Sequence, residues 1–126
     1  MALILGNTAL VLNAYAVLVN ETPGAAALAE HQAYIAANGV AGYKTALNGV
    51  FTGVSTADLA TRMLANLGLT TAWPTAQADA VAYLTASSNR VEAMMVLADK
   101  LYNYTGTDAK LVAASTAYKA EIAGSY

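Results

Sequence analysis

The stretch Asn89–Tyr102 has the sequence NRVEAMMVLADKLY and carries the clearest structural signal in the chain. Its apolar residues recur at intervals of three and four, which is the spacing that places side chains along one face of an α-helix. Asn89 with Glu92 three residues later is typical of a helix N-terminus, where the first side chain accepts a hydrogen bond from a free backbone N–H. Because Met94 and Met95 fall on the apolar face, we expect them in a hydrophobic core rather than in an adaptable binding groove.

Similar signals on both sides of this stretch predict six or seven helices. The first three run from Asn7 or Thr8 to Val19, from Pro23 to Asn38 and Gly39, and from Val40 to Asn48; Thr22 is expected to cap the second, and Gly42 to interrupt the third. The other four run from the Ser55–Asp58 capping box to Gly68, from Trp73 and Pro74 to Ser87, over Asn89–Tyr102, and from Asp108 to Gly124. No run alternates as a half-buried strand does. The sequence therefore predicts an all-α fold in which residues 1–126 form one compact domain of short Ala-rich helices.

The composition argues against several classes of function. Of the 126 residues, 57% are hydrophobic and 11% are charged, the net charge is −2, and there is no cysteine. The isoelectric point of about 5.1 argues against a nucleic-acid partner. The lack of cysteine rules out disulfides, thiol catalysis and Cys-type zinc sites.

Neither a membrane span nor a cleavable secretory signal is expected. The most apolar run, Thr8–Val19, contains Asn13 and is shorter than the roughly 20 apolar residues that a span needs. The apolar stretch Leu3–Leu5 is too short for a secretory signal, and no positive charge precedes it. Export that uses a carboxy-terminal signal stays open.

The chain has one histidine, His31, which lies next to Glu30. It shares a helix face with Leu28 and Ile35, so we expect a half-buried structural ring that makes a local hydrogen bond. The alternative is an enzyme or small-molecule pocket around His31 and Glu30, which an apolar cavity with His31 at its mouth would support. No metal site or cofactor is expected, because the sequence has no His pair at helical spacing, no calcium-binding loop and no phosphate-binding loop.

Aromatic and basic residues gather near the carboxyl end of the chain. Tyr102, Asn103 and Tyr104 lie between Lys100 and Lys110. Aromatic faces together with amide and ammonium donors suit sugar rings and acidic sugar groups, so these five residues are candidates for glycan binding. The alternative is that Tyr102 packs inward and Tyr104 covers the end of its helix.

Two longer stretches carry a family resemblance. Leu12–Ile35, LNAYAVLVNETPGAAALAEHQAYI, is a helix, a Thr-Pro turn and a second helix, and Leu97–Leu111, LADKLYNYTGTDAKL, is a looser copy with a Thr-Gly turn. This unit recurs in large secreted surface proteins of Gram-negative bacteria. With its cysteine-free composition rich in Ala, Thr and Asn, the chain resembles the amino-terminal helical domain of surface-layer (S-layer) proteins exported by type I secretion.

The resemblance implies a structural role at the cell surface. In that family the amino-terminal domain anchors the lattice to lipopolysaccharide, while a carboxy-terminal calcium-binding domain builds the lattice and an uncleaved carboxy-terminal signal directs secretion. The calcium-binding repeats are absent here, so we expect an anchoring fragment or an isolated domain. The implied protein is non-enzymatic and extracellular, with lipopolysaccharide and copies of itself or the rest of a surface lattice as partners. A self-assembly or protein-interaction module without glycan binding is the alternative.

Overall fold

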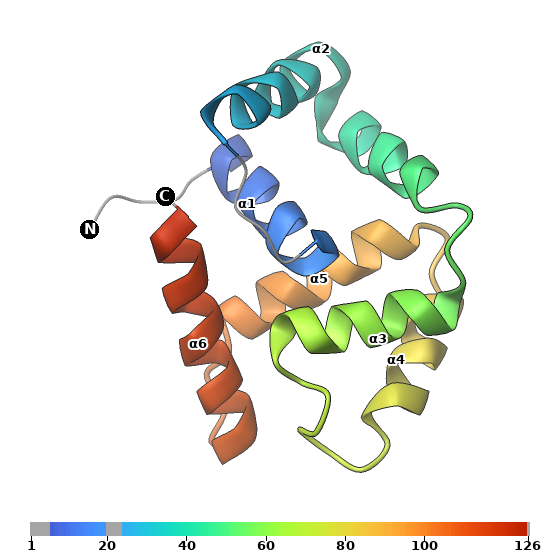
Figure 1. Cartoon of the computed structure of the whole chain (residues 1–126), viewed down its shortest axis with the longest axis vertical. Coiled ribbons are helices and arrows are strands. Elements are labelled where there is room, and N and C mark those ends of the chain that lie inside the picture. Colours follow the sequence, from blue (N-terminus) through green and yellow to red (C-terminus); the bar gives the residue numbers. More distant parts are fainter. Residues whose placement is uncertain (1–5, 20–23, 126) are drawn as a thin grey trace.

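The computed structural model describes residues 6–19 and 24–125, and every regular element in this part of the chain is a helix (Figure 1). The predicted all-α fold is confirmed. The helices are α1 (Gly6–Val19), α2 (Ala25–Val50), α3 (Thr56–Leu67), α4 (Ala76–Thr85), α5 (Arg90–Tyr102) and α6 (Ala109–Ser125).

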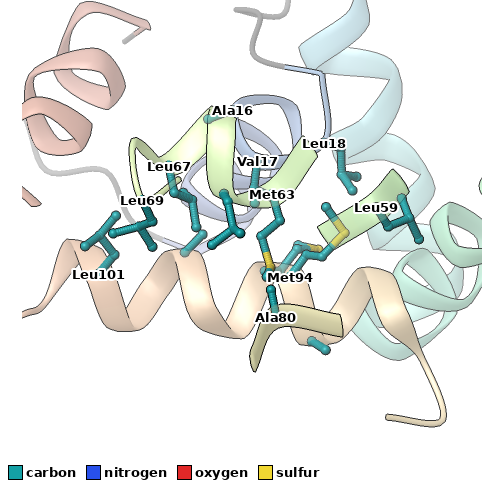
Figure 2. Packing of buried hydrophobic residues seen from close by; sticks show 14 of the residues in the cluster. Ala16, Val17, Leu18, Leu59, Met63, Leu67, Leu69, Ala80, Met94 and Leu101 are labelled. Carbon is teal, nitrogen blue, oxygen red and sulfur yellow. The ribbon is translucent and has the colours of Figure 1, made fainter. Parts of the chain in front are cut away.

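Helix α5 lies at the centre of the packing, because it contacts each of the other five helices. Its apolar face is buried as predicted. Met94 has no exposed surface and Met95 is 4% exposed, so both methionines belong to the core. Figure 2 shows α3 lying across α5, with Met63 of α3 pointing toward Met94. The stretch with the clearest helical signal in the sequence, Asn89–Tyr102, therefore forms the helix at the centre of the fold.

Predicted side-chain caps set where α3 and α5 begin. Ser55 Oγ accepts a hydrogen bond from the backbone N–H of Asp58 at 3.1 Å, and Asn89 Oδ1 accepts one from the backbone N–H of Glu92 at 2.8 Å. Each bond satisfies an N–H that the helix itself leaves without a partner. Helix α3 ends at Gly68, whose φ of 70° is the left-handed conformation that glycine adopts at little cost.

Helix α2 is bent at Gly39, which has φ 78° and ψ 168°. Only glycine adopts this backbone conformation readily, and Figure 1 shows the two halves of α2 meeting at a corner. The predicted end of one helix at Asn38 and Gly39 is therefore present as a bend. The predicted interruption at Gly42 is wrong, because the helix resumes after Gly39 and one further glycine weakens a helix without ending it.

Other predicted helix ends are displaced. Helix α1 begins before Asn7 and Thr8, so these residues lie inside its first turn instead of capping it. Helix α6 continues through Gly124 to Ser125. The cap predicted at Thr22 and Pro23 lies outside the described residues.

Helix α4 begins later than the predicted start at Trp73 and Pro74. The side chain of Asp79 accepts hydrogen bonds from the residues that precede the helix. One carboxylate oxygen of Asp79 accepts hydrogen bonds from the indole N–H of Trp73 at 2.7 Å and from the hydroxyl of Thr75 at 2.8 Å. These bonds hold residues 73–75 in a turn that precedes the helix. They also lower the pKa of Asp79, with the bond from Trp73 as the larger cause.

Candidate functional site

Two of the predicted glycan-binding residues hold the carboxyl end of α5 in place. The half-buried ring of Tyr102 lies edge-on against Tyr118 of α6, with ring centroids 6.4 Å apart and ring planes at 85°. The side-chain amide of Asn103 donates to the backbone oxygen of Asp99 at 2.9 Å, and the backbone N–H of Asn103 donates to the same oxygen at 3.0 Å. Tyr102 thus packs toward a neighbouring helix, while Asn103 is exposed.

Tyr104 closes the loop between α5 and α6. Its hydroxyl accepts a hydrogen bond from the backbone N–H of Asp108 at 3.2 Å, and its ring lies so close to Gly106 that a Cβ there would collide with ring atoms. Asp108 in turn caps α6 by accepting from the backbone N–H groups of Lys110 and Leu111 at 3.0 Å and 3.1 Å. Because Tyr104 is half-buried, it covers this cap and still leaves part of its ring open to solvent.

Lys110 links this loop to a second one. Its ammonium group donates to the backbone oxygen of Thr71, in the loop between α3 and α4, at 3.2 Å. The two loops expose five threonine side chains, and we call the surface that four of them form with Tyr104 and Lys110 the threonine corner. Its threonines are Thr70, Thr71, Thr105 and Thr107.

Lys100 lies apart from these contacts. It lines an open hollow of about 350 Å³ between α1, α2 and α5, together with Asn13, Lys44 and Asp99. The structure therefore places Tyr104 and Lys110 at one surface with Asn103 at its edge, and gives Lys100 and Tyr102 different neighbours.

His31 is held between two tyrosines. The hydroxyl of Tyr15 in α1 lies 3.3 Å from His31 Nε2, and the hydroxyl of Tyr43 in the second half of α2 lies 2.7 Å from Nδ1. A neutral imidazole has one N–H and one lone pair, so one tyrosine donates and the other accepts. The expected half-buried ring is confirmed, although its partners are distant in sequence rather than local.

Tyr43 is the buried member of this trio, with 3% of its surface exposed. Burial raises the pKa of Tyr43 to about 12, and the nearby Tyr15 adds to the rise. The hydroxyl of Tyr43 therefore keeps its proton further into the alkaline range than an ordinary tyrosine does, and remains available for the bond to His31.

Two open hollows adjoin His31. We call the first the tyrosine hollow; it has a volume of about 260 Å³ and is lined by Glu30, His31, Tyr34, Tyr43, Ala46, Leu47 and Val50. The second has a volume of about 320 Å³, extends toward Tyr15 and Leu18, and shares His31 and Tyr43 with the first. The small-molecule alternative would be supported by an apolar cavity with His31 exposed at its mouth. The two hollows are open and mostly apolar in lining, and His31 lines both but is half-buried.

Sequence reasoning had singled out His31 but neither of its tyrosine partners. Tyr15, His31 and Tyr43 meet because the bend at Gly39 brings the second half of α2 back toward the first half and α1. Each tyrosine occupies an ordinary position on an apolar helix face, and spacing along the chain does not encode the angle between two helices. The predicted helix end at Gly39 was the one sequence signal for a bend that could bring these three side chains together.

The described residues offer no cluster of three or more His, Asp or Glu side chains placed to hold a metal ion. Within the same part of the chain, no helix is long and apolar enough to cross a membrane. Comparison with protein-family models, with curated proteins and with solved structures gives no significant match. The resemblance to S-layer anchoring domains therefore rests on Leu12–Ile35 and Leu97–Leu111 alone.

Proposed function

We propose that this chain is a non-enzymatic domain that anchors a secreted surface layer to cell-surface lipopolysaccharide. The resemblance of Leu12–Ile35 and Leu97–Leu111 to S-layer anchoring domains supports this role, and the all-α fold is consistent with it. In this proposal the protein is extracellular, the threonine corner binds the glycan, and the other partners are further copies of the chain or the rest of the layer.

The observation that carries the proposal is the hydrogen bond from Lys110 to the backbone oxygen of Thr71, which joins two hydroxyl-rich loops at the surface. An ammonium group has three donors, so Lys110 keeps others for a sugar acid or a phosphate. Threonine hydroxyls donate and accept as sugar hydroxyls do. The open part of the Tyr104 ring offers an apolar surface for a sugar ring.

The corner is held in place before any ligand arrives. Tyr104 is fixed by the backbone of Asp108 and by Gly106, and Lys110 is fixed by Thr71. Binding therefore orders few side chains, which lowers its entropic cost. Each corner would still bind weakly, and a layer of many copies could raise the apparent affinity by a factor of ~10² to 10⁴.

The contacts of His31 support a non-enzymatic role. Both ring nitrogens face tyrosine hydroxyl groups, at 2.7 Å and 3.3 Å. A general base needs a nitrogen that faces the substrate and a partner that orients the ring, and here each nitrogen is already occupied. We assign His31 to holding α1 against the two halves of α2.

The proposal is tested with purified lipopolysaccharide and two variants. Replacing both Tyr104 and Lys110 by Ala removes the aromatic surface and the ammonium group, and we expect glycan binding to weaken about tenfold or more. Lys119→Ala, which removes an exposed lysine from the same helix outside the corner, is the matched control and is expected to bind like the parent. Circular dichroism checks that both variants are folded, and unchanged binding by the folded double variant rejects the corner as the glycan site.

A self-assembly module is the second candidate, and the surface around α2 favours it. Four large apolar side chains stand exposed at the end of α1 and along α2, namely Val19, Tyr34, Val40 and Val50. Exposed apolar side chains gathered on one part of a surface often mark a contact with another protein. This candidate predicts association that rises with protein concentration and needs no glycan, which sedimentation velocity measures.

A further inference from the structure

We propose that the tyrosine hollow binds an organic cation that carries methyl groups, such as the quaternary ammonium group of choline. Figure 1 shows α2 at one end of the molecule and the loop between α3 and α4 at the other. The hollow and the threonine corner therefore lie far apart, and this second site does not depend on glycan binding.

The first part of the site is a run of three rings that line the hollow, those of His31, Tyr43 and Tyr34, and Tyr15 extends this run outside the hollow. Tyr15 and His31 have ring centroids 5.3 Å apart, His31 and Tyr43 are 5.5 Å apart, and Tyr43 and Tyr34 are 6.4 Å apart. Their planes meet at 61°, 79° and 53°, so the rings turn relative to one another instead of stacking. The half-open ring of Tyr34 offers the most accessible aromatic face in this run, and a negative ring face attracts an alkylated ammonium group.

The second part of the site is the carboxylate of Glu30. It lines the same hollow as Tyr34 and Tyr43, is exposed, and has no hydrogen-bond or ion-pair partner among the described residues. Lys44, on the same helix, is 3.7 Å from Glu92 and lines a different hollow. The tyrosine hollow therefore has an unpaired negative charge in its lining, which favours a positively charged ligand.

The size and the lining of the hollow favour methylated cations. Its volume of about 260 Å³ is smaller than most pockets for drug-sized ligands, which begin near ~300 Å³. Leu47 and Val50 add apolar side chains to its lining, and these can contact methyl groups. Calcium or magnesium would find only one carboxylate in this lining, which is fewer oxygen ligands than these ions need.

The site is also fixed in advance. His31 is bonded to Tyr15 and Tyr43, so the central rings keep their positions without a ligand. Tyr34, which is 42% exposed, stands at the open side and contacts Tyr43. A cation entering the hollow would therefore meet rings that are already in place, and little ordering would oppose binding.

Nuclear magnetic resonance titration of the full chain with choline tests this proposal. We expect saturable shifts at residues that line the hollow, with a millimolar dissociation constant. The neutral isostere 3,3-dimethylbutan-1-ol has the same shape without the charge, and ammonium chloride has the charge without the methyl groups. Both are expected to bind roughly tenfold more weakly or worse. Equal binding of the isostere, or no saturable shift with choline, overturns the proposal.

Two variants locate the site. Glu30→Gln and Tyr34→Ala are each expected to weaken choline binding about two- to tenfold. Both side chains are exposed, and the spectrum of each variant reports directly whether it is folded. Glu92→Gln, which removes an exposed carboxylate outside the hollow, is the matched control and leaves choline binding unchanged. Unchanged affinity in both Glu30→Gln and Tyr34→Ala rejects the site.

The same cation occurs free in solution and in lipid headgroups, and flotation with vesicles separates these sources. The lipid headgroup is the ligand if the protein floats with phosphatidylcholine vesicles but not with phosphatidylglycerol vesicles, and if Tyr34→Ala no longer floats with either. Saturable binding of free choline without retention identifies a free solute, and retention that persists in Tyr34→Ala contradicts the site. The Tyr104 and Lys110 double variant keeps its choline binding, so failure of the glycan proposal is distinguishable from failure of this one.

Discussion

Hydrogen bonds from single neutral side chains join one helix to another. The hydroxyl of Tyr118 in α6 donates to Oδ1 of Asn13 in α1 at 2.6 Å, and the hydroxyl of Tyr83 in α4 donates to the backbone oxygen of Ala93 in α5 at 2.7 Å. In a chain with only 11% charged residues, such bonds take the place that ion pairs have in other proteins. They satisfy polar groups inside the protein without the cost of burying charge.

The bond between Tyr118 and Asn13 leads to a prediction of stability. Tyr118→Phe leaves the half-buried Asn13 oxygen without its donor, and we expect the free energy of unfolding to fall by about 1–2 kcal/mol. Urea denaturation followed by circular dichroism measures this change. Tyr34→Phe removes an exposed hydroxyl and is expected to leave stability unchanged. A Tyr118→Phe variant as stable as the parent would show that the bond contributes nothing.

Alkaline pH is expected to destabilise the protein through its buried tyrosines. Burial raises the pKa of Tyr43 to about 12, and burial, followed by the nearby Glu121, raises that of Tyr118 well above its ordinary value. Unfolded tyrosines lose their protons near pH ~10, so above this pH the folded chain binds more protons than the unfolded chain, and the free energy of unfolding falls. Denaturation at a series of pH values between about 9 and 12 measures how the free energy of unfolding changes with pH. A free energy of unfolding that stays constant over this range would show that these tyrosines titrate alike in the folded and unfolded states.

At the scale of elements, the bend in α2 decides which residues meet at the tyrosine hollow. The two halves of α2 carry His31 and Tyr43 on opposite sides of Gly39, and a straight helix could not bring the Tyr43 hydroxyl within hydrogen-bond distance of His31. The bend depends on a φ of 78° that other residues adopt only under strain. The backbone conformation of Gly39 therefore positions the aromatic rings of His31 and Tyr43 at the tyrosine hollow.

A matched pair of glycine substitutions tests this role. Gly39→Ala places a Cβ on a strained backbone and is expected to lower the free energy of unfolding by about 1–3 kcal/mol. Gly49→Ala meets open space in helical backbone of the same element, so it is expected to be neutral or to stabilise by up to about 1 kcal/mol. Thermal unfolding compares the two variants with the parent. The bend would not depend on glycine if Gly39→Ala proved as stable as Gly49→Ala.

The elements that the sequence predicted correctly are those whose signals are local. Ser55 and Asn89 cap helices because their partners lie three residues away, and the stripe with Met94 marks the core because one helix places it on one face. The candidate site was predicted less well, because its contacts are not local. Lys110 finds Thr71 in another loop, and the partners of His31 depend on how helices cross. Spacing along the chain carries no record of such crossings.

At the scale of the whole molecule, the protein is a tightly packed helical core under a surface with few charges. Helix α5 contacts every other helix, and most of the buried side chains form one large cluster. Val11, Ile35 and Tyr43 form a second, smaller cluster. Lys44 of α2 and Glu92 of α5 form an ion pair, at 3.7 Å. A surface of this kind suits many weak neutral contacts better than one strong charged contact, and a repeated layer can add such contacts together.

The most direct test of the anchoring proposal is binding of the purified chain to cells of its source that carry lipopolysaccharide and to the same cells stripped of it. We predict binding to the first and loss of binding to the second, with the Tyr104 and Lys110 double variant failing on both. Equal binding to both kinds of cell, or to neither, would contradict anchoring through the glycan. Binding to neither, together with association of the chain in solution, would favour the self-assembly candidate.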